Sequence, residues 1–207
     1  MSWRKLALSF FGVCLFAAVS FAADVAGGKI LFIDSYHLGY DWSDGVVNGV
    51  REMLKETGTE LRIFRMDTKR NQSEAFKRQA ALQAKALIDT YQPDVVIASD
   101  DNASKYLIQP YFRDADLPIV FCGVNWDASV YGYPYANATG MVEVELIESL
   151  MAQLRQLAKG DKSGFLSIDG TTSIKDNAHH AKILGKPYDK TYYVMTYQEW
   201  KERFLQL

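Results

Sequence analysis

Apolar and polar residues alternate along the chain in a pattern that predicts strands, each followed by a helix. Continuous apolar runs at 29–34, 94–98 and 118–122 are typical of strands buried in a parallel sheet. The run at 61–66 alternates apolar and basic residues, which predicts a strand nearer the sheet edge. Four such strand–helix repeats with short connections predict an α/β fold with a parallel, doubly wound sheet.

Capping residues indicate where the intervening helices begin and end. Ser43 and Ser73 stand where two helices are expected to start, and Gly58 follows the first of them. A third helix is predicted from Asn102 to about Gln109, where Pro110 ends or kinks it.

The pattern changes after the fourth strand. Residues 127–139 are rich in Tyr, Pro and Asn without periodicity, and a crossing strand is expected at 140–144. An amphipathic helix at 146–157 precedes a second series, with strands at 164–169 and 192–195 and helices near 174–184 and from Gln198. We therefore expect a first lobe over 23–140, and a hinge crossing with an incomplete second α/β lobe over 141–207.

The first 22 residues have the organisation of a secretory signal peptide. Arg4 and Lys5 precede an apolar run over 6–19, and Ser20-Phe21-Ala22 supplies small residues where a signal peptidase cleaves. A membrane anchor is the alternative, but the run is shorter than the ~20 residues of a spanning helix. We expect cleavage after Ala22, a periplasmic product and no stable membrane insertion after cleavage.

Removal of this segment changes the charge and the cysteine content. Loss of Arg4 and Lys5 lowers the formal net charge from −2 to −4, and no basic stripe remains, so a nucleic acid partner is not expected. Cys122 becomes the only cysteine, which excludes an internal disulfide and suits a bacterial periplasm.

Candidate binding residues follow the strands, because ligands of open α/β sheets bind at the carboxyl ends of the strands. Tyr36, Tyr40 and Trp42 either pack as core or form a stacking platform for a planar ligand. The cluster at 67–70 is either a ligand contact or a solvated ion cluster. Asp101 or Asn102 either caps a helix or contacts ligand. Residues 169–173 open a helix, and helix N-termini can bind anions.

Catalytic and metal-binding patterns are absent from the sequence. It contains no G-x-G-x-x-G, no phosphate-binding G-x-x-x-x-G-K-S/T and no G-x-S-x-G. His37 is isolated, and His179 and His180 are adjacent, so they point in different directions and are expected at the surface. We predict no catalytic site, no metal and no cofactor.

Taken together, the segments 35–42, 66–70, 99–103 and 120–125 resemble those of the ABC-transporter substrate-binding protein family. The resemblance covers 29–207 and extends to a branch whose domains also serve as extracytoplasmic sensor modules. It implies a type I periplasmic-binding fold whose two lobes close on a small solute, with an ABC-transporter permease as the implied partner; the alternative is a sensor module of a signal-transduction receptor. The ligand contacts implied are Ser35, Tyr36, Tyr40, Trp42, Asp100, Asn102, Asn125, Asp169, Thr171 and Thr172.

The sequence departs from this family at its end. A complete member has a finished second lobe, whereas this sequence stops in a predicted helix that carries Trp200, Phe204 and Leu205. We therefore expect a truncated second sheet with an exposed apolar surface.

Overall fold

The structure is a computed structural model, and it describes residues 27–207. The predicted signal peptide at 1–22 lies outside these residues. Over 27–207, no helix combines the length and the apolar character needed to cross a bilayer.

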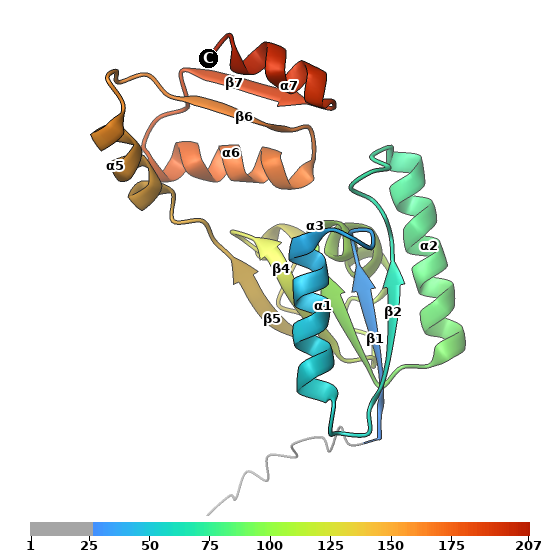
Figure 1. Cartoon of the computed structure of the whole chain (residues 1–207). Helices are drawn as coiled ribbons and strands as arrows, with labels where there is room; N and C mark the ends of the chain where they lie inside the picture. Colours follow the sequence, from blue (N-terminus) through green and yellow to red (C-terminus); the bar gives the residue numbers. More distant parts are fainter. Residues whose placement is uncertain (1–26) are drawn as a thin grey trace, which may run out of the picture.

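A five-stranded parallel sheet forms the first lobe, which confirms the predicted fold class. Its order is β2-β1-β3-β4-β5, so the connections reverse direction between β1 and β3 and leave a crevice at their carboxyl ends. The arrowheads in Figure 1 all reach this same edge. The strands are β1 (Lys29–Asp34), β2 (Glu60–Arg65), β3 (Val95–Ser99), β4 (Ile119–Asn125) and β5 (Ala138–Glu143).

The predicted crossing strand is β5, the fifth strand of this sheet. It pairs with β4 as far as Glu143, with a register shift between Phe121 and Val124. The connection to the second lobe therefore begins after Glu143.

Helices pack on both faces of the sheet, and the buried strand residues contribute much of the core. Leu31, Ile33, Val96 and Ala98 are fully buried, because parallel strands covered on both faces expose neither set of side chains. The helical segments are α1 (Asp41–Leu54), α2 (Glu74–Tyr91), α3 (Asp100–Ala103), the π-helical η1 (Ser104–Ile108), α4 (Gln109–Tyr111) and the 3-10 turn η2 (Ser129–Tyr131).

One of the two predicted helix caps is correct. Ser73 accepts a hydrogen bond from the Phe76 amide at 3.3 Å and caps α2 as expected. The prediction for Ser43 was wrong: α1 begins at Asp41, and Ser43 lies buried inside the helix, where its hydroxyl donates to Asp34 at 2.5 Å. A buried carboxylate competes for the hydroxyl that would otherwise satisfy the helix end.

The second lobe is a two-stranded parallel sheet with three helices. In Figure 1, α6 lies between this sheet and the carboxyl edge of the first sheet, and α7 lies on the other side. Its elements are α5 (Ile147–Leu157), β6 (Gly164–Ile168), α6 (Thr171–Ile183), β7 (Lys190–Val194) and α7 (Tyr197–Phe204). As predicted, large apolar side chains are exposed here, including Leu154, Trp200, Phe204 and Leu205.

The expectation that His180 lies at the surface was wrong. Its side chain is buried and is placed between Glu145 at 2.7 Å and the Tyr188 hydroxyl at 2.9 Å. Adjacent helix positions diverge, so only His179 of the pair remains partly exposed, stacked on Trp126 with ring centroids 5.3 Å apart.

Candidate functional site

A cavity of about 250 Å³ lies between the carboxyl edge of the first sheet and the N-terminus of α6. The first lobe lines it with Tyr36, Tyr40, Thr68, Lys69, Gln72, Lys77 and Asn102. The second lobe lines it with Ser167, Ile168, Gly170, Thr171, Thr172 and Ser173. We call this cavity the cleft. It is next to the β1–β3 switch point, where ligands of open α/β sheets bind.

An aromatic pair forms one wall of the cleft. The rings of Tyr36 and Tyr40 stack with centroids 4.3 Å apart, and Trp42 tilts against Tyr36 at 5.4 Å. Trp42 also packs over Gly123, where a Cβ atom would stand 2.5 Å from the indole and where φ is +64°. Glycine is required there for both reasons.

Lys69 brings a positive charge into the cleft above a buried acid. Its ammonium group lies 3.0 Å from Asp100 and 4.7 Å from the centre of the Tyr36 ring. Asp100 is only 1% exposed and also accepts a hydrogen bond from the Tyr36 hydroxyl at 3.1 Å. Burial raises the pKa of Asp100, while Lys69 opposes that shift. Asp100 therefore holds the side chains of Tyr36 and Lys69 in position at the cleft.

Asn102 lines the cleft and contains a buried acceptor without a partner. Its amide nitrogen donates to the Thr68 hydroxyl at 2.9 Å, and that hydroxyl donates its own proton to the Ser35 carbonyl at 2.8 Å. Thr68 can only accept from Asn102, which fixes the orientation of the amide. The Asn102 Oδ1 atom is left buried without a partner.

The α6 helix directs its N-terminus at the cleft. Gly170 occupies the N-cap position and provides no side-chain cap, and Thr171, Thr172 and Ser173 of the first turn all line the cavity. The first-turn amides of a helix lack intrahelical acceptors, so this end is electropositive.

Direct contacts join the two lobes at the edge of the cleft. Lys175 forms a salt bridge of 2.7 Å with Asp101, which is fully buried. The Trp126 indole donates to Asp176 at 2.8 Å, and Lys69 donates to the Thr172 hydroxyl at 3.0 Å. Burial raises the pKa of Asp176 to about 6. The lobes thus meet through charged and polar groups drawn from both.

Three loops at this edge hold non-glycine residues in the left-handed region. Asp67 follows β2 with φ 52°, Asp100 follows β3 with φ 76°, and Trp126 follows β4 with φ 61°. Such residues are strained and cluster at functional sites.

Half of the predicted contact residues line the cleft. These are Tyr36, Tyr40, Asn102, Thr171 and Thr172. The others, Ser35, Trp42, Asp100, Asn125 and Asp169, are not among its lining residues. The Ser35 hydroxyl donates to the Ser99 carbonyl and accepts from the Ala103 amide. Asn125 donates to Asp101 at 3.2 Å, and Asp169 is exposed.

The structure divides the 67–70 cluster between the surface and the cleft. Arg70 pairs with Asp67 at 2.7 Å on the surface, whereas Lys69 turns into the cleft. Cleft residues beyond the ten implied contacts are Thr68, Lys69, Gly170 and Ser173, which lie in the candidate segments 67–70 and 169–173, and Gln72, Lys77, Ser167 and Ile168, which were not predicted. The position of Lys69 after a strand indicated a place at the sheet edge. Its pair with Asp100 could not be predicted, because the two residues are distant in sequence.

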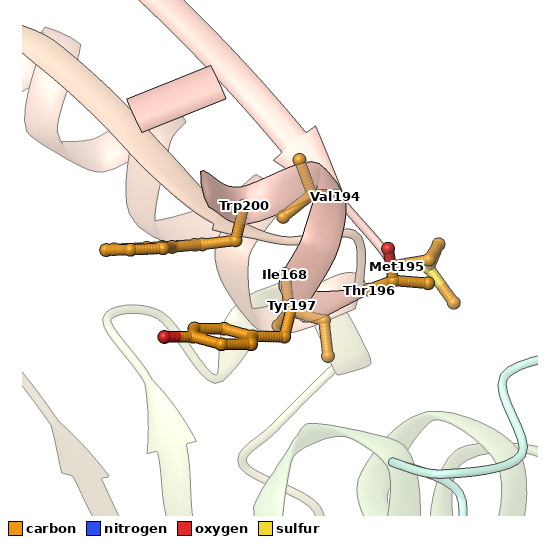
Figure 2. Close-up of a pocket in the computed structure, with 6 residues that line it drawn as sticks. All are labelled: Ile168, Val194, Met195, Thr196, Tyr197 and Trp200. Atoms are coloured by element: carbon orange, nitrogen blue, oxygen red, sulfur yellow. The ribbon is translucent and has the colours of Figure 1, made fainter. Parts of the chain in front are cut away.

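An apolar pocket of about 320 Å³ adjoins the cleft and shares Ile168 with it. Figure 2 shows Ile168, Val194, Met195, Thr196, Tyr197 and Trp200 around it. The Thr196 hydroxyl already accepts from the Glu199 amide as the cap of α7. Few polar groups remain there to orient a solute. Within 27–207, no cluster of His, Cys, Asp and Glu is arranged to hold a metal ion.

Comparisons with known proteins agree with this architecture. A scan against protein-family models gives no match, and a search of curated proteins gives none either. Solved structures do match. A ligand-free, open substrate-binding protein from Clostridium difficile is 13% identical, with TM-score 0.53 over 87% of this chain and 62% of its own.

Two further matches contain bound ligands. An ABC domain from Streptococcus pneumonia in complex with L-Trp is 15% identical, with TM-score 0.58 over 83% of this chain and 59% of its own. A solute-binding protein of an ABC transporter from Rhodopseudomonas palustris HaA2, in complex with p-hydroxybenzoic acid, is 12% identical, with TM-score 0.58 over 86% of this chain and 50% of its own. The chain therefore spans about half to three fifths of the length of these proteins, and its α/β architecture is that of type I periplasmic-binding proteins.

Proposed function

We propose that this chain is an extracytoplasmic solute-binding protein that captures a small solute in the cleft for an ABC importer. The observation that carries the proposal is the cleft itself, a cavity lined by both lobes at the switch point of the first sheet. A solute that contacts both lobes at once stabilises the closed arrangement over the open one.

The chemistry of the cleft supports binding and not catalysis. Its lining combines a stacked aromatic pair, lysines and a helix N-terminus, but it contains no His, Cys, Asp or Glu. The lining therefore lacks the imidazole, thiol and carboxylate groups that most often act as general bases or activated nucleophiles. Two of the matched solved structures are described as substrate-binding or solute-binding proteins.

A thermal-shift screen of amino acids, aromatic acids, purines and sugars tests the proposal. A solute at 100 times its dissociation constant adds about 2.7 kcal/mol to the free energy of unfolding. At least one class is expected to raise the melting temperature. If no class raised it, the proposal would be wrong.

Gly170→Phe ties any hit to the cleft. A Cβ atom at Gly170 has room, with its nearest neighbour, Gln72 Oε1, 3.5 Å away, so the backbone tolerates the change while the ring fills the cleft. We expect this variant to lose the shift. Gly160→Phe is the matched control, because Gly160 lies in the second lobe outside the cleft with open space around it. Equal shifts in the two variants would place binding elsewhere.

A further inference from the structure

We propose that the solute is a small aromatic carboxylate carrying a neutral hydroxyl group, and that it is not an amino acid. The inference rests on the proposed solute-binding function and deepens it. It is carried by two lysines and a helix N-terminus that line the cleft, a buried acceptor without a partner on Asn102 and an aromatic wall, which together specify three parts of one ligand.

The carboxylate is specified by the charges. Lys69 and Lys77 are the charged residues that line the cleft, and their acidic partners, Asp100 and Glu74, are not among the lining residues. The Lys69 ammonium uses two of its three protons on Asp100 and Thr172, each at 3.0 Å, which leaves one for a ligand. The uncapped first turn of α6 lies opposite, so an anion placed between the two is attracted from both lobes.

The hydroxyl is specified by Asn102. The residue is 3% exposed, its orientation is fixed through Thr68, and its Oδ1 atom has no partner. A buried acceptor without a partner is costly, and a ligand that donates to it removes that cost.

An ammonium group fits less well than a hydroxyl. Ammonium has three donors and requires several acceptors or a carboxylate. The cleft lining contains no carboxylate, because Asp100 and Asp101 are buried beneath it and are paired with Lys69 and Lys175. A second cation would also stand near Lys69.

The ring is specified by the wall and by the size of the cleft. Tyr36 and Tyr40 offer stacked π surfaces, and aromatic rings pack well against such surfaces. A cavity of about 150 Å³ holds benzene. The volume of about 250 Å³ therefore accommodates one ring with small substituents.

Isothermal titration calorimetry on the full chain tests each part separately. The probes are 3- and 4-hydroxybenzoate, benzoate, 4-hydroxybenzamide and L-tyrosine. The better hydroxybenzoate is expected to bind at least about tenfold more tightly than benzoate, which lacks the donor, and than the amide, which lacks the charge. L-Tyrosine is expected to bind more weakly than either hydroxybenzoate.

Two variants assign the groups. In Asn102→Ala, the preference for hydroxybenzoate over benzoate should fall to within about twofold. In Lys69→Gln, the preference for hydroxybenzoate over the amide should fall in the same way, while Arg70→Gln, which alters the neighbouring surface cation, keeps it. Each readout compares two ligands on one variant, so a loss of stability alone does not produce it.

The outcomes separate this inference from the proposed function. Equal binding of benzoate and hydroxybenzoate, or a preference that persists in Asn102→Ala, overturns the inference. If another solute class binds and Gly170→Phe abolishes that binding, the ligand class is wrong and the proposed function stands. If no solute binds in a cleft-dependent way, both are wrong.

Discussion

Polar side chains at the strand ends divide into those that face the cleft and those that support it. Ser35 and Asp100 use their polar atoms inside the protein, whereas Asn102 and Lys69 line the cleft and the Asn102 Oδ1 atom has no partner. Because these residues follow strands in the sequence, they could be placed correctly at the carboxyl edge of the sheet. The division between the two roles depends on partners such as Thr68, which only the folded sheet brings close, so sequence could not supply it.

The buried carboxyl group of Asp176 should make the stability of the protein depend on pH. Burial raises its pKa to about 6, and the hydrogen bond from Trp126 opposes this shift. The charges of Glu145 and Asp101 also raise the pKa, whereas His180 lowers it. A carboxyl group with a raised pKa in the folded state stabilises the protein below its unfolded pKa, and that stability is lost as the pH rises through about 6.

Asp176→Asn should therefore gain stability relative to the unsubstituted chain, by about 1 kcal/mol more at pH 7 than at pH 4. Asparagine keeps the acceptor for the Trp126 indole, so the variant removes mainly the charge. Urea denaturation at several pH values measures the difference. A difference that is the same at pH 4 and pH 7 would contradict the assignment.

Among the elements, continuous apolar runs located β1, β3 and β4 from sequence, because both faces of these strands are covered. Less was predictable where tertiary contacts override local pattern. Ser43 lies inside α1 and bonds to Asp34, and His180 lies buried between Glu145 and Tyr188. Neither pair is recognisable from periodicity.

Arg65 joins three of these elements. Its guanidinium on β2 binds Asp34 of β1 at 2.5 Å and Asp44 of α1 at 2.8 Å, and Asp34 is fully buried. Arg65→Met leaves the charge of Asp34 buried and uncompensated, so we expect a loss of about 3 kcal/mol in the free energy of unfolding.

Arg62→Met is the control on the same strand. Arg62 is exposed, lies over the Tyr91 ring and should change stability by about 0.5 kcal/mol or less. Chemical denaturation of both variants checks the comparison. Similar losses in the two would show that Arg65 does not join the elements as described.

For the whole molecule, the lobes are held together by contacts present without a ligand. Lys175 of α6 reaches the buried Asp101, so the pair stabilises the contact between the lobes. In Lys175→Met, Asp101 retains bonds from Asn125 and Thr172 and no cation on α6. Opening would rehydrate the carboxylate.

We therefore expect the solute-free Lys175→Met variant to have a larger radius of gyration than the unsubstituted chain in small-angle X-ray scattering. Lys182→Met, an exposed position on the same helix, should leave the radius unchanged. If Lys175→Met scattered identically to the unsubstituted chain, the ion pair would not contribute to closure.

The proposed location is testable at the other end of the chain. Cleavage after Ala22 predicts that protein recovered from a bacterial periplasm begins at Ala23, as read by N-terminal sequencing. A product that retains Arg4 and Lys5 would contradict export by cleavage.

We propose that the cleft between the two lobes holds a small solute, and a crystal structure of the chain with the best solute from the screen tests this proposal. We expect ligand density between the Tyr36–Tyr40 wall and the first turn of α6, within hydrogen-bonding distance of Asn102 Oδ1. Density in the apolar pocket of Figure 2, with the cleft holding only water, would contradict it.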